Sequence, residues 1–232
     1  MRFIVGSRSC VIILGLAGSV LAGSTAGNAQ ERCQDVLVDV TADSADERNR
    51  ACSAARHALQ LIGRCGIFLR KPLPILILKE VKHPFGGPIF GFFDTKREQV
   101  LVTQTANVQS LVEGTPYAAL PPIEFHRSLI VHEVVHGVMH QNLKWTPNSR
   151  AAYEYPAYAL QIESLPSNVR DGFLKSLIES KAGPSFLFSD SLLGFDPYFF
   201  GARAYEHFKS SPDGCTHLWG LTEGSVDFIG AG

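Results

Sequence analysis

Three residues of this chain have types and spacing that could support hydrolysis: His132, Glu133 and His136, inside the apolar run 129–138. In an α-helix each residue turns by about 100°, so side chains four positions apart lie on one face. His132 and His136 would then direct both imidazoles to one point, which suits two ligands of a tetrahedral metal ion. Glu133 would lie beside that ion, where its carboxylate could take a proton from water. The pattern predicts a hydrolytic metal site.

The flanking residues favour the helix that this site needs. Pro121 and Pro122 can begin a helix and Asn142 lies near its expected end, so we expect a helix over residues 121–142. Two histidines and a glutamate on an otherwise apolar helix are costly to bury without partners. A chance match is the alternative, at odds on the order of one in a hundred for a chain of this size.

A catalytic zinc ion usually has three protein ligands and keeps one position for water. The extended pattern with a third histidine six residues after the second is excluded, because that position is Asn142. We expect Glu154, 18 positions after His136, to be the third ligand. A turn over residues 144–149 could bring its helix back against the first, with small residues at the contact: Gly137, Ala151 and Ala152.

Two other acids are weaker candidates for this role. Glu163 is nine residues after Glu154, and nine steps of about 100° place it on the opposite face of a helix. The two glutamates therefore cannot both bind the ion. Glu206 is a more distant alternative.

The set His132-Glu133-x-x-His136 plus Glu154 resembles the gluzincins, the thermolysin-like zinc metallopeptidases, over about a quarter of the chain. The resemblance implies that His132, His136 and Glu154 bind zinc, that Glu133 is the general base, and that the substrate is a peptide or protein. It also implies that a strand at the sheet edge, just before the motif helix, holds extended substrate. Residues 98–103 or their hairpin partner occupy that place.

The chain also departs from that family. Pro156 follows Glu154 by two residues, so the second helix should begin near Glu154 or kink there. The Asn-Glu-x-x-x-Asp context of thermolysin-like enzymes is missing. A group that stabilises the oxyanion is required, and the spacing does not select among six candidates: Tyr153, Tyr155, Tyr158, Tyr205, His207 and His217. His126 and His140 are expected to have packing, capping or supporting roles.

Two non-enzymatic alternatives stay open. The same ligands could form the site of a non-catalytic zinc-binding or interaction protein that retains the zincin fold. The chain could also be a metal-free interaction domain. Independently of that choice, the aromatic residues at positions 85, 90, 92 and 93 could line an apolar substrate cleft, although such a run more often forms core.

The start of the chain predicts export. Residues 1–29 read as a secretory signal, with Arg2 and Arg8 before an apolar stretch over residues 10–21 and small residues before cleavage at Ala29. The stretch is short for a membrane span. We expect one mature domain, residues 30–232, that is secreted or periplasmic. A net charge of −1 without a Lys/Arg block gives no support for binding to nucleic acid or anionic membranes.

Four cysteines remain after the signal, and an exported chain is expected to pair them. If a strand at residues 36–40 and a helix at residues 51–62 fold back on each other, the helix end returns toward the strand start. This arrangement favours Cys33–Cys65 and leaves Cys52–Cys215.

The order of expected elements is that of an α+β, zincin-like fold: a small mixed or antiparallel sheet on the motif helix, then a mainly helical C-terminal half. Further strands are expected at residues 73–81, with Pro72 and Pro74 limiting this strand to an edge or an irregular start, and in a hairpin of residues 89–93 and 98–103. The other expected elements are helices at residues 107–112, 149–164, 167–180 and 197–210, a loop at residues 184–195, and an ambiguous tail at residues 215–232.

Overall fold

The computed structural model describes residues 29–83, 85–178, 188–210 and 214–226, and its fold is α+β, as the sequence predicts. A five-stranded mixed sheet has the order β1-β2-β3-β7-β6. The three central strands are parallel, and the two outer strands pair antiparallel with their neighbours. The strands are β1 Ala29–Arg32, β2 Val38–Ala42, β3 Leu73–Leu78, β6 Gly91–Asp94 and β7 Gln99–Thr103, and a separate small hairpin is formed by β4 Val81–Lys82 and β5 Pro88–Ile89.

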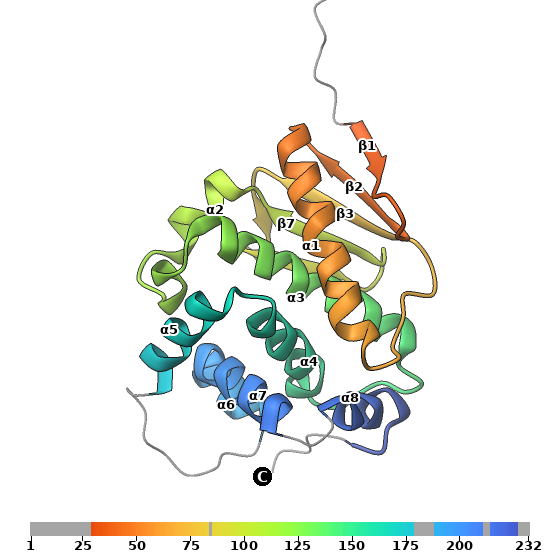
Figure 1. The fold of residues 1–232 in the computed structure, drawn as a ribbon, viewed down its shortest axis with the longest axis vertical. Helices are drawn as coiled ribbons and strands as arrows, with labels where there is room; N and C mark the ends of the chain where they lie inside the picture. The colour runs from red at the N-terminus through yellow and green to blue at the C-terminus, as the bar shows by residue number, and fades with distance from the viewer. Residues whose placement is uncertain (1–28, 84, 179–187, 211–213, 227–232) are drawn as a thin grey trace, which may run out of the picture.

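The helices cover one face of this sheet and then build the C-terminal half (Figure 1). α1 and α3 lie side by side on the sheet, and α4 packs against the side of α3 away from it. α7 packs in turn on α4. The elements are α1 Ala45–Gly63, α2 Thr105–Val112, η1 Pro116–Ala119, α3 Pro122–Asn142, α4 Arg150–Glu163, α5 Ser167–Ile178, α6 Asp190–Phe195, α7 Pro197–Ser210 and α8 Gly214–Glu223.

The alternation of buried and half-buried residues explains why one sheet face is covered. In β2 the even-numbered residues are buried beneath the helices, and in β3 the odd-numbered residues are. The residues between them are partly exposed. α3 differs because apolar side chains surround most of its circumference, which suits a helix enclosed by the sheet, α1 and α4. The motif residues on α3 are thus held inside the core instead of at its surface.

Of the two starts that the prolines allow, an edge position is wrong, because β3 is the central strand, and an irregular entry is the one found. In a parallel ladder, successive residues of a strand bond to alternate neighbours. The Leu73 N–H donates to the Leu37 carbonyl on the β2 side, so position 74 faces the β7 side. Pairing with β7 begins at Ile75, and the missing N–H of Pro74 therefore interrupts no ladder bond.

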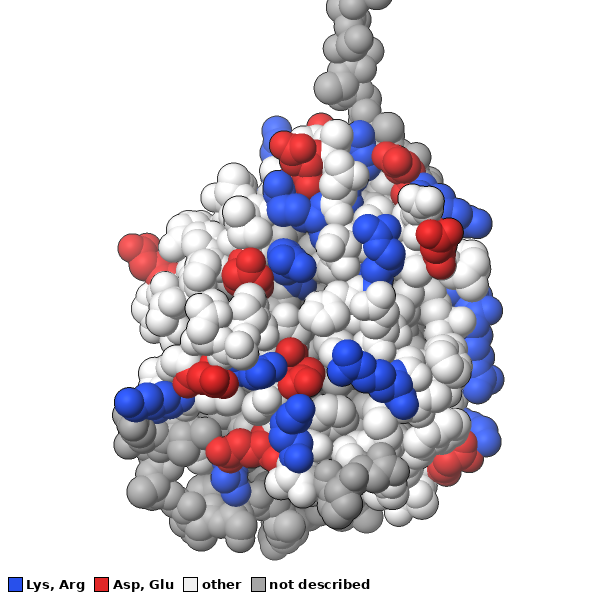
Figure 2. Space-filling model, in the orientation of Figure 1, with Lys and Arg blue, Asp and Glu red and all other residues white. Residues whose placement is uncertain are grey.

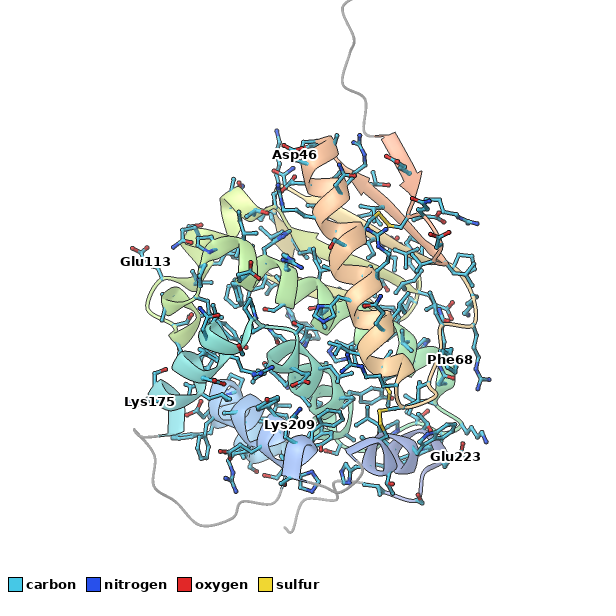
Figure 3. The ribbon with its side chains drawn as sticks, in the orientation of Figure 1. Asp46, Phe68, Glu113, Lys175, Lys209 and Glu223 are labelled. Carbon is cyan, nitrogen blue, oxygen red and sulfur yellow. A yellow bond between two sulfur atoms is a disulfide. The ribbon has the colours of Figure 1, made fainter. Side chains whose placement is uncertain are left out.

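The predicted disulfide pairing was also wrong. The structure joins Cys33 to Cys52 and Cys65 to Cys215, with Cα–Cα distances of 5.4 and 4.9 Å. A strand rises about 3.3 Å per residue and a helix about 1.5 Å, so roughly ten helical residues span the length of β2. Cys52 in α1 is therefore level with the start of β2, and Cys65 lies beyond the sheet. Figure 3 shows the Cys65–Cys215 bond between the end of α1 and α8.

Several boundaries differ from those expected. α1 begins six residues earlier because the Ser44 hydroxyl caps it by accepting the Glu47 N–H. Residues 190–195 form a helix instead of a loop, capped in the same way by Ser189 and the Leu192 N–H. β1 forms in a segment to which the sequence analysis assigned no element, and α8 forms in the tail that it left ambiguous. The signal-peptide prediction falls mainly on residues 1–28, outside the described residues.

The described surface is of mixed charge. On the face in Figure 2, acidic and basic side chains are interspersed over the helices and sheet. Among the described residues, no helix combines the length and apolar character that crossing a membrane requires.

Candidate metal site

The packing of α3 and α4 brings together the three residues expected to bind a metal. His132 and His136 come from the middle of α3, and Glu154 comes from the second turn of α4. Gly137 does not face α4 as expected. A Cβ there would lie 2.8 Å from the Leu73 side chain, so this glycine permits close packing of α3 on β3.

The distances within the trio fit a tetrahedral ion. The Nε2 atoms of His132 and His136 are 3.1 Å apart, and Glu154 Oε2 lies 3.3 Å from the first and 3.6 Å from the second. Ligands about 2.05 Å from a tetrahedral zinc are separated by about 3.3 Å, close to all three edges. Two nitrogens and one carboxylate oxygen are also donors that zinc favours. The group can therefore hold a metal ion.

The trio is enclosed but reachable from solvent. The side chains of His132 and His136 are 9% and 14% exposed, and that of Glu154 is 24% exposed. A wholly sealed site would suit a structural ion, whereas part of the Glu154 side chain here remains exposed to solvent.

Glu133 lies beside the trio, as the helical geometry requires. It is buried and accepts a hydrogen bond from the backbone N–H of Phe93 in β6. β6 approaches it so closely that a Cβ on Gly91 would lie 2.9 Å from Glu133 Oε1. The glycine is therefore required for the contact between this edge strand and the carboxylate.

The pKa values of the two carboxylates are shifted in opposite directions. Burial raises the pKa of Glu133, and the nearby His132, His136 and Phe93 N–H offset only part of that effect. Burial also acts to raise the pKa of Glu154, but the two imidazoles outweigh it and hold its pKa well below the usual range. The pKa of His136 is raised, because Glu154 outweighs the effect of burial. Glu154 is thus kept ionised, as a ligand must be, while Glu133 is the more basic carboxylate.

Gln161 is a site residue that the sequence analysis missed. Its Oε1 lies 2.9 Å from His132 Nδ1, and both side chains are buried. Gln161 is seven residues after Glu154, so it lies on the same face of α4. Many residues share such a spacing, and nothing else in the sequence marked this glutamine as a partner of His132.

Tyr158 packs against the trio, Tyr117 interacts with Glu154, and Tyr198 packs on Tyr117; of these three, Tyr158 is among the six oxyanion candidates. The Tyr158 ring packs edge-on against His132 at a centroid distance of 4.7 Å. Burial raises the pKa of Tyr158, with further contributions from Tyr117, Glu154 and Tyr198, so its hydroxyl stays protonated. Tyr117 and Tyr198 were not predicted. Tyr198 also lines a hollow of about 780 Å³ between η1, α5 and the start of α7.

The remaining oxyanion candidates have other positions. Tyr155, His207 and His217 form a separate aromatic cluster, in which the Tyr155 hydroxyl is 2.7 Å from His207 Nδ1. Tyr205 lies beneath the Arg170 guanidinium. No contact with the trio is recorded for Tyr153, a half-buried residue of the described part of α4.

The two weaker candidates for the third ligand form ion pairs elsewhere. Glu163 forms ion pairs with Arg170 and Lys209, and Glu206 forms one with Arg203. Glu154 is therefore the acid that the structure brings to the histidines.

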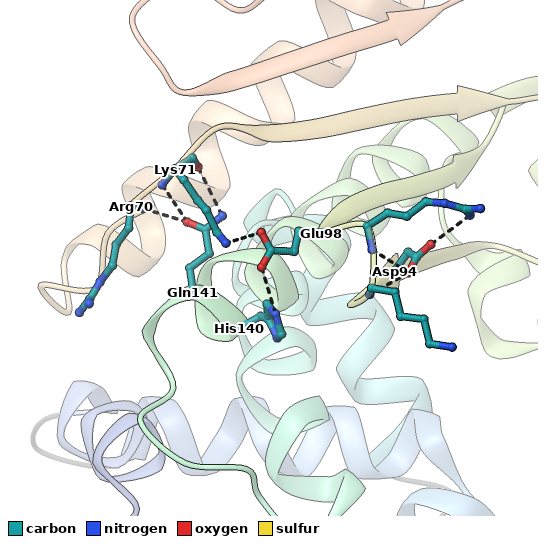
Figure 4. A network of polar contacts seen from close by, with 8 residues as sticks. Arg70, Lys71, Asp94, Glu98, His140 and Gln141 are labelled. Carbon is teal, nitrogen blue, oxygen red and sulfur yellow. Dashed lines mark hydrogen bonds and ion pairs between the residues drawn. The ribbon is translucent and has the colours of Figure 1, made fainter.

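His126 and His140 have the supporting positions expected for them. His126 is buried, its Nε2 donates to the Thr103 carbonyl, and burial lowers its pKa to about 4. His140 contacts Glu98, which also binds Lys71, at the turn between β6 and β7 (Figure 4). The Phe93 ring lies 5.4 Å from the ring of His140. These contacts attach the β6–β7 turn to the end of α3.

Comparison with known proteins gives a family and no function. No curated protein and no solved structure matches the chain. A family described as "Family of unknown function (DUF6639)" matches residues 38–230, a range that contains the whole site. The match covers well over half of the sequence, and the chain therefore belongs to the DUF6639 family.

Proposed function

We propose that this protein is a zinc-dependent metallopeptidase of the gluzincin type, in which His132, His136 and Glu154 bind the ion and Glu133 is the general base. The observation that carries the proposal is the convergence of the three ligand atoms beside a buried glutamate of raised pKa. A structural zinc site needs only its ligands, whereas metal-assisted hydrolysis also needs a general base beside them, and Glu133 is in that position.

Zinc is the ion that best suits two imidazoles and one carboxylate at these separations. When bound, it would supply Lewis acidity, polarising the scissile carbonyl and lowering the pKa of water. The other requirements are met by side chains and backbone of the chain itself.

Glu133 would move the proton. It takes a proton from the attacking water and passes it to the leaving amine nitrogen, which needs a carboxylate more basic than an exposed glutamate. Its raised pKa supports this role, and the Phe93 N–H holds the carboxylate in place.

Tyr158 is the side chain best placed to stabilise the oxyanion. It is four residues after Glu154, one turn further along α4, and packs against His132. Because its hydroxyl stays protonated, it can donate a hydrogen bond to the oxygen on which negative charge develops.

The edge strand β6 gives a place for an extended peptide. One of its sides is paired with β7, and it contacts the catalytic region at Gly91 and Phe93. A substrate that pairs with β6 would be held by backbone hydrogen bonds next to Glu133. The two disulfides are typical of exported proteins, so we place this activity outside the cytoplasm.

The test compares Glu133→Gln with the wild type on a peptide library, with zinc content measured by metal analysis. We expect one zinc ion in each protein and a fall in kcat/KM of roughly 10²–10⁴-fold in the variant. Glu124→Gln, on the same helix but paired with Arg127, is the matched control and should keep full activity.

Two outcomes would contradict the proposal. Hydrolysis that survives Glu133→Gln would exclude this glutamate as the base. Stoichiometric zinc in a wild-type protein that cleaves no member of the library would instead favour a non-catalytic zinc-binding protein.

A further inference from the structure

We propose that Gln161 is the positioning residue of the metal site: its amide oxygen orients His132 and selects its tautomer, and it does so without adding a charge. The inference rests on the metal site of the proposed function and is independent of peptide hydrolysis.

The first support is the hydrogen bond itself. Gln161 Oε1 can only accept, so the His132 Nδ1 at 2.9 Å must carry the proton and donate. The His132 Nε2 atom is then unprotonated, and its lone pair points to the position shared with His136 and Glu154. Outer hydrogen bonds of this kind fix the ring orientation of ligand histidines.

The second support is that Gln161 is itself held in one orientation. Its Nε2 lies 3.5 Å from the Ser128 hydroxyl oxygen, which donates its own hydrogen to the Phe125 carbonyl at 2.8 Å. The hydroxyl oxygen is thus left to accept from the amide. A flipped amide would place its NH₂ group against the His132 Nδ1–H, which is unfavourable. Ser128 is also one turn before His132, so the contacts of Gln161 join α4 to two successive turns of α3.

The third support is the charge balance. Glu154 and the adjacent, buried Glu133 already bring two carboxyl groups to the site. A carboxylate at position 161 would add further negative charge and reduce the Lewis acidity of the ion. An amide supplies the same acceptor oxygen without that cost, and at 3% exposure a charged group would also be expensive to bury.

The experiment measures zinc affinity by competition with a chromophoric chelator for the wild type and three variants. Gln161→Leu removes the acceptor and should weaken zinc binding by 10- to 100-fold. Gln161→Glu restores an acceptor and should bind zinc at least as tightly as the wild type. Gln109→Leu, at an exposed position of α2, is the matched control and should leave the affinity unchanged.

A second measurement separates positioning from simple support of the fold. In ¹⁵N-labelled, zinc-loaded protein, the His132 Nδ1–H should be protected from exchange in the wild type and Gln161→Glu, and lost by exchange in Gln161→Leu. If Gln161→Leu lowers the melting temperature but leaves zinc affinity and Nδ1–H protection unchanged, the residue is only structural and the proposal is wrong.

Failure of the two proposals can be told apart. A wild type that binds zinc but cleaves no peptide overturns the hydrolase and leaves the role of Gln161 to be decided by affinity. A wild type that binds no zinc overturns both. If Gln161→Leu does not fold, Gln161→Met takes its place: it removes the acceptor oxygen with a side chain of similar length and should also weaken zinc binding, and an unchanged affinity would overturn the proposal.

Discussion

Two pairs of histidines in this molecule have nearly the same ring geometry but different third partners. The rings of His132 and His136 are 4.8 Å apart with an interplanar angle of 76°, and those of His207 and His217 are 4.9 Å apart at 72°. Consecutive residues of α4 reach the two pairs: Glu154 contacts the first and Tyr155 the second.

The partner decides the electrostatics of each pair. Glu154 raises the pKa of His136 despite burial, whereas burial lowers the pKa of His207 and lowers that of His217 to about 4. A carboxylate between two imidazoles therefore prepares a place for a cation, and a phenol beside two imidazoles favours neutral rings. Paired histidines alone do not make a metal site.

The two histidine pairs also differ in the elements that carry them, and this difference leads to the prediction with the largest expected change in stability. His132 and His136 share α3, but His217 lies on α8, which is tied to the end of α1 by Cys65–Cys215. Replacing both cysteines by serine removes a link across 150 residues and should lower the free energy of unfolding by about 5 kcal/mol, measured by urea denaturation.

The same variant tests whether the two pairs are independent. Zinc affinity of the folded protein should stay within about threefold of the wild type, because the bond joins neither α3 nor α4. The matched control is Cys33→Ser with Cys52→Ser, where a separation of 19 residues predicts a smaller loss of about 3 kcal/mol. A large loss of zinc affinity in the first variant would break the comparison.

Removing the carboxylate should make the first pair resemble the second. Glu154→Gln leaves two imidazoles beside a neutral group, and we expect zinc affinity to fall on the order of a thousandfold, about 4 kcal/mol. Titration calorimetry would measure it. His207→Gln should leave zinc binding unchanged, and a comparable fall in that control would place the ion elsewhere.

Tyr155→Phe probes the second pair without touching the first. It removes the hydroxyl of a fully buried tyrosine, 2.7 Å from His207 Nδ1, so stability should fall by about 1 kcal/mol. Thermal denaturation measures this loss, and zinc affinity measured alongside should not change. A Phe variant that bound zinc much more weakly would show that the two clusters are coupled through α4.

The smallest effect is a pH dependence. Because the folded pKa of His217 is depressed to about 4, the unfolded chain takes up its proton first, and stability is lost as pH falls from about 6.5 toward 4. His217→Gln should reduce this loss by about 1 kcal/mol or less, since the ring is only partly shielded from solvent. Denaturation of the metal-free proteins at pH 7.5 and pH 5 would measure it, and identical pH slopes for both proteins would contradict it.

The sequence could predict the parts of the site that depend on spacing within one helix or between adjacent helices. His132, Glu133 and His136 follow from the helical repeat, and Glu154 from the need for a third ligand on a helix that folds back. Gln161 and Tyr198 could not be chosen, because their contacts depend on how α4 and α7 pack. Such packing leaves no local pattern of residue types.

The fold was predictable to a similar extent. Short apolar runs indicated the central strands, and Pro121, Pro122 and Asn142 marked the two ends of α3. The prolines left an edge position and an irregular entry open for β3, and the second is found because pairing with β7 begins only after Pro74. The disulfides were misassigned because the rise per residue is larger in a strand than in a helix. A helix of 19 residues therefore extends beyond a strand of five, and its end does not lie at the start of that strand.

The sequence separations of the two disulfides imply an order of oxidation in an exported chain. Cys33 and Cys52 can join soon after α1 has emerged, whereas Cys65 must wait for almost all of the remaining residues before Cys215 arrives. During that interval three thiols from one short stretch compete for the first bond. An isomerase that releases Cys65 from premature partners would therefore raise the yield of correctly paired protein.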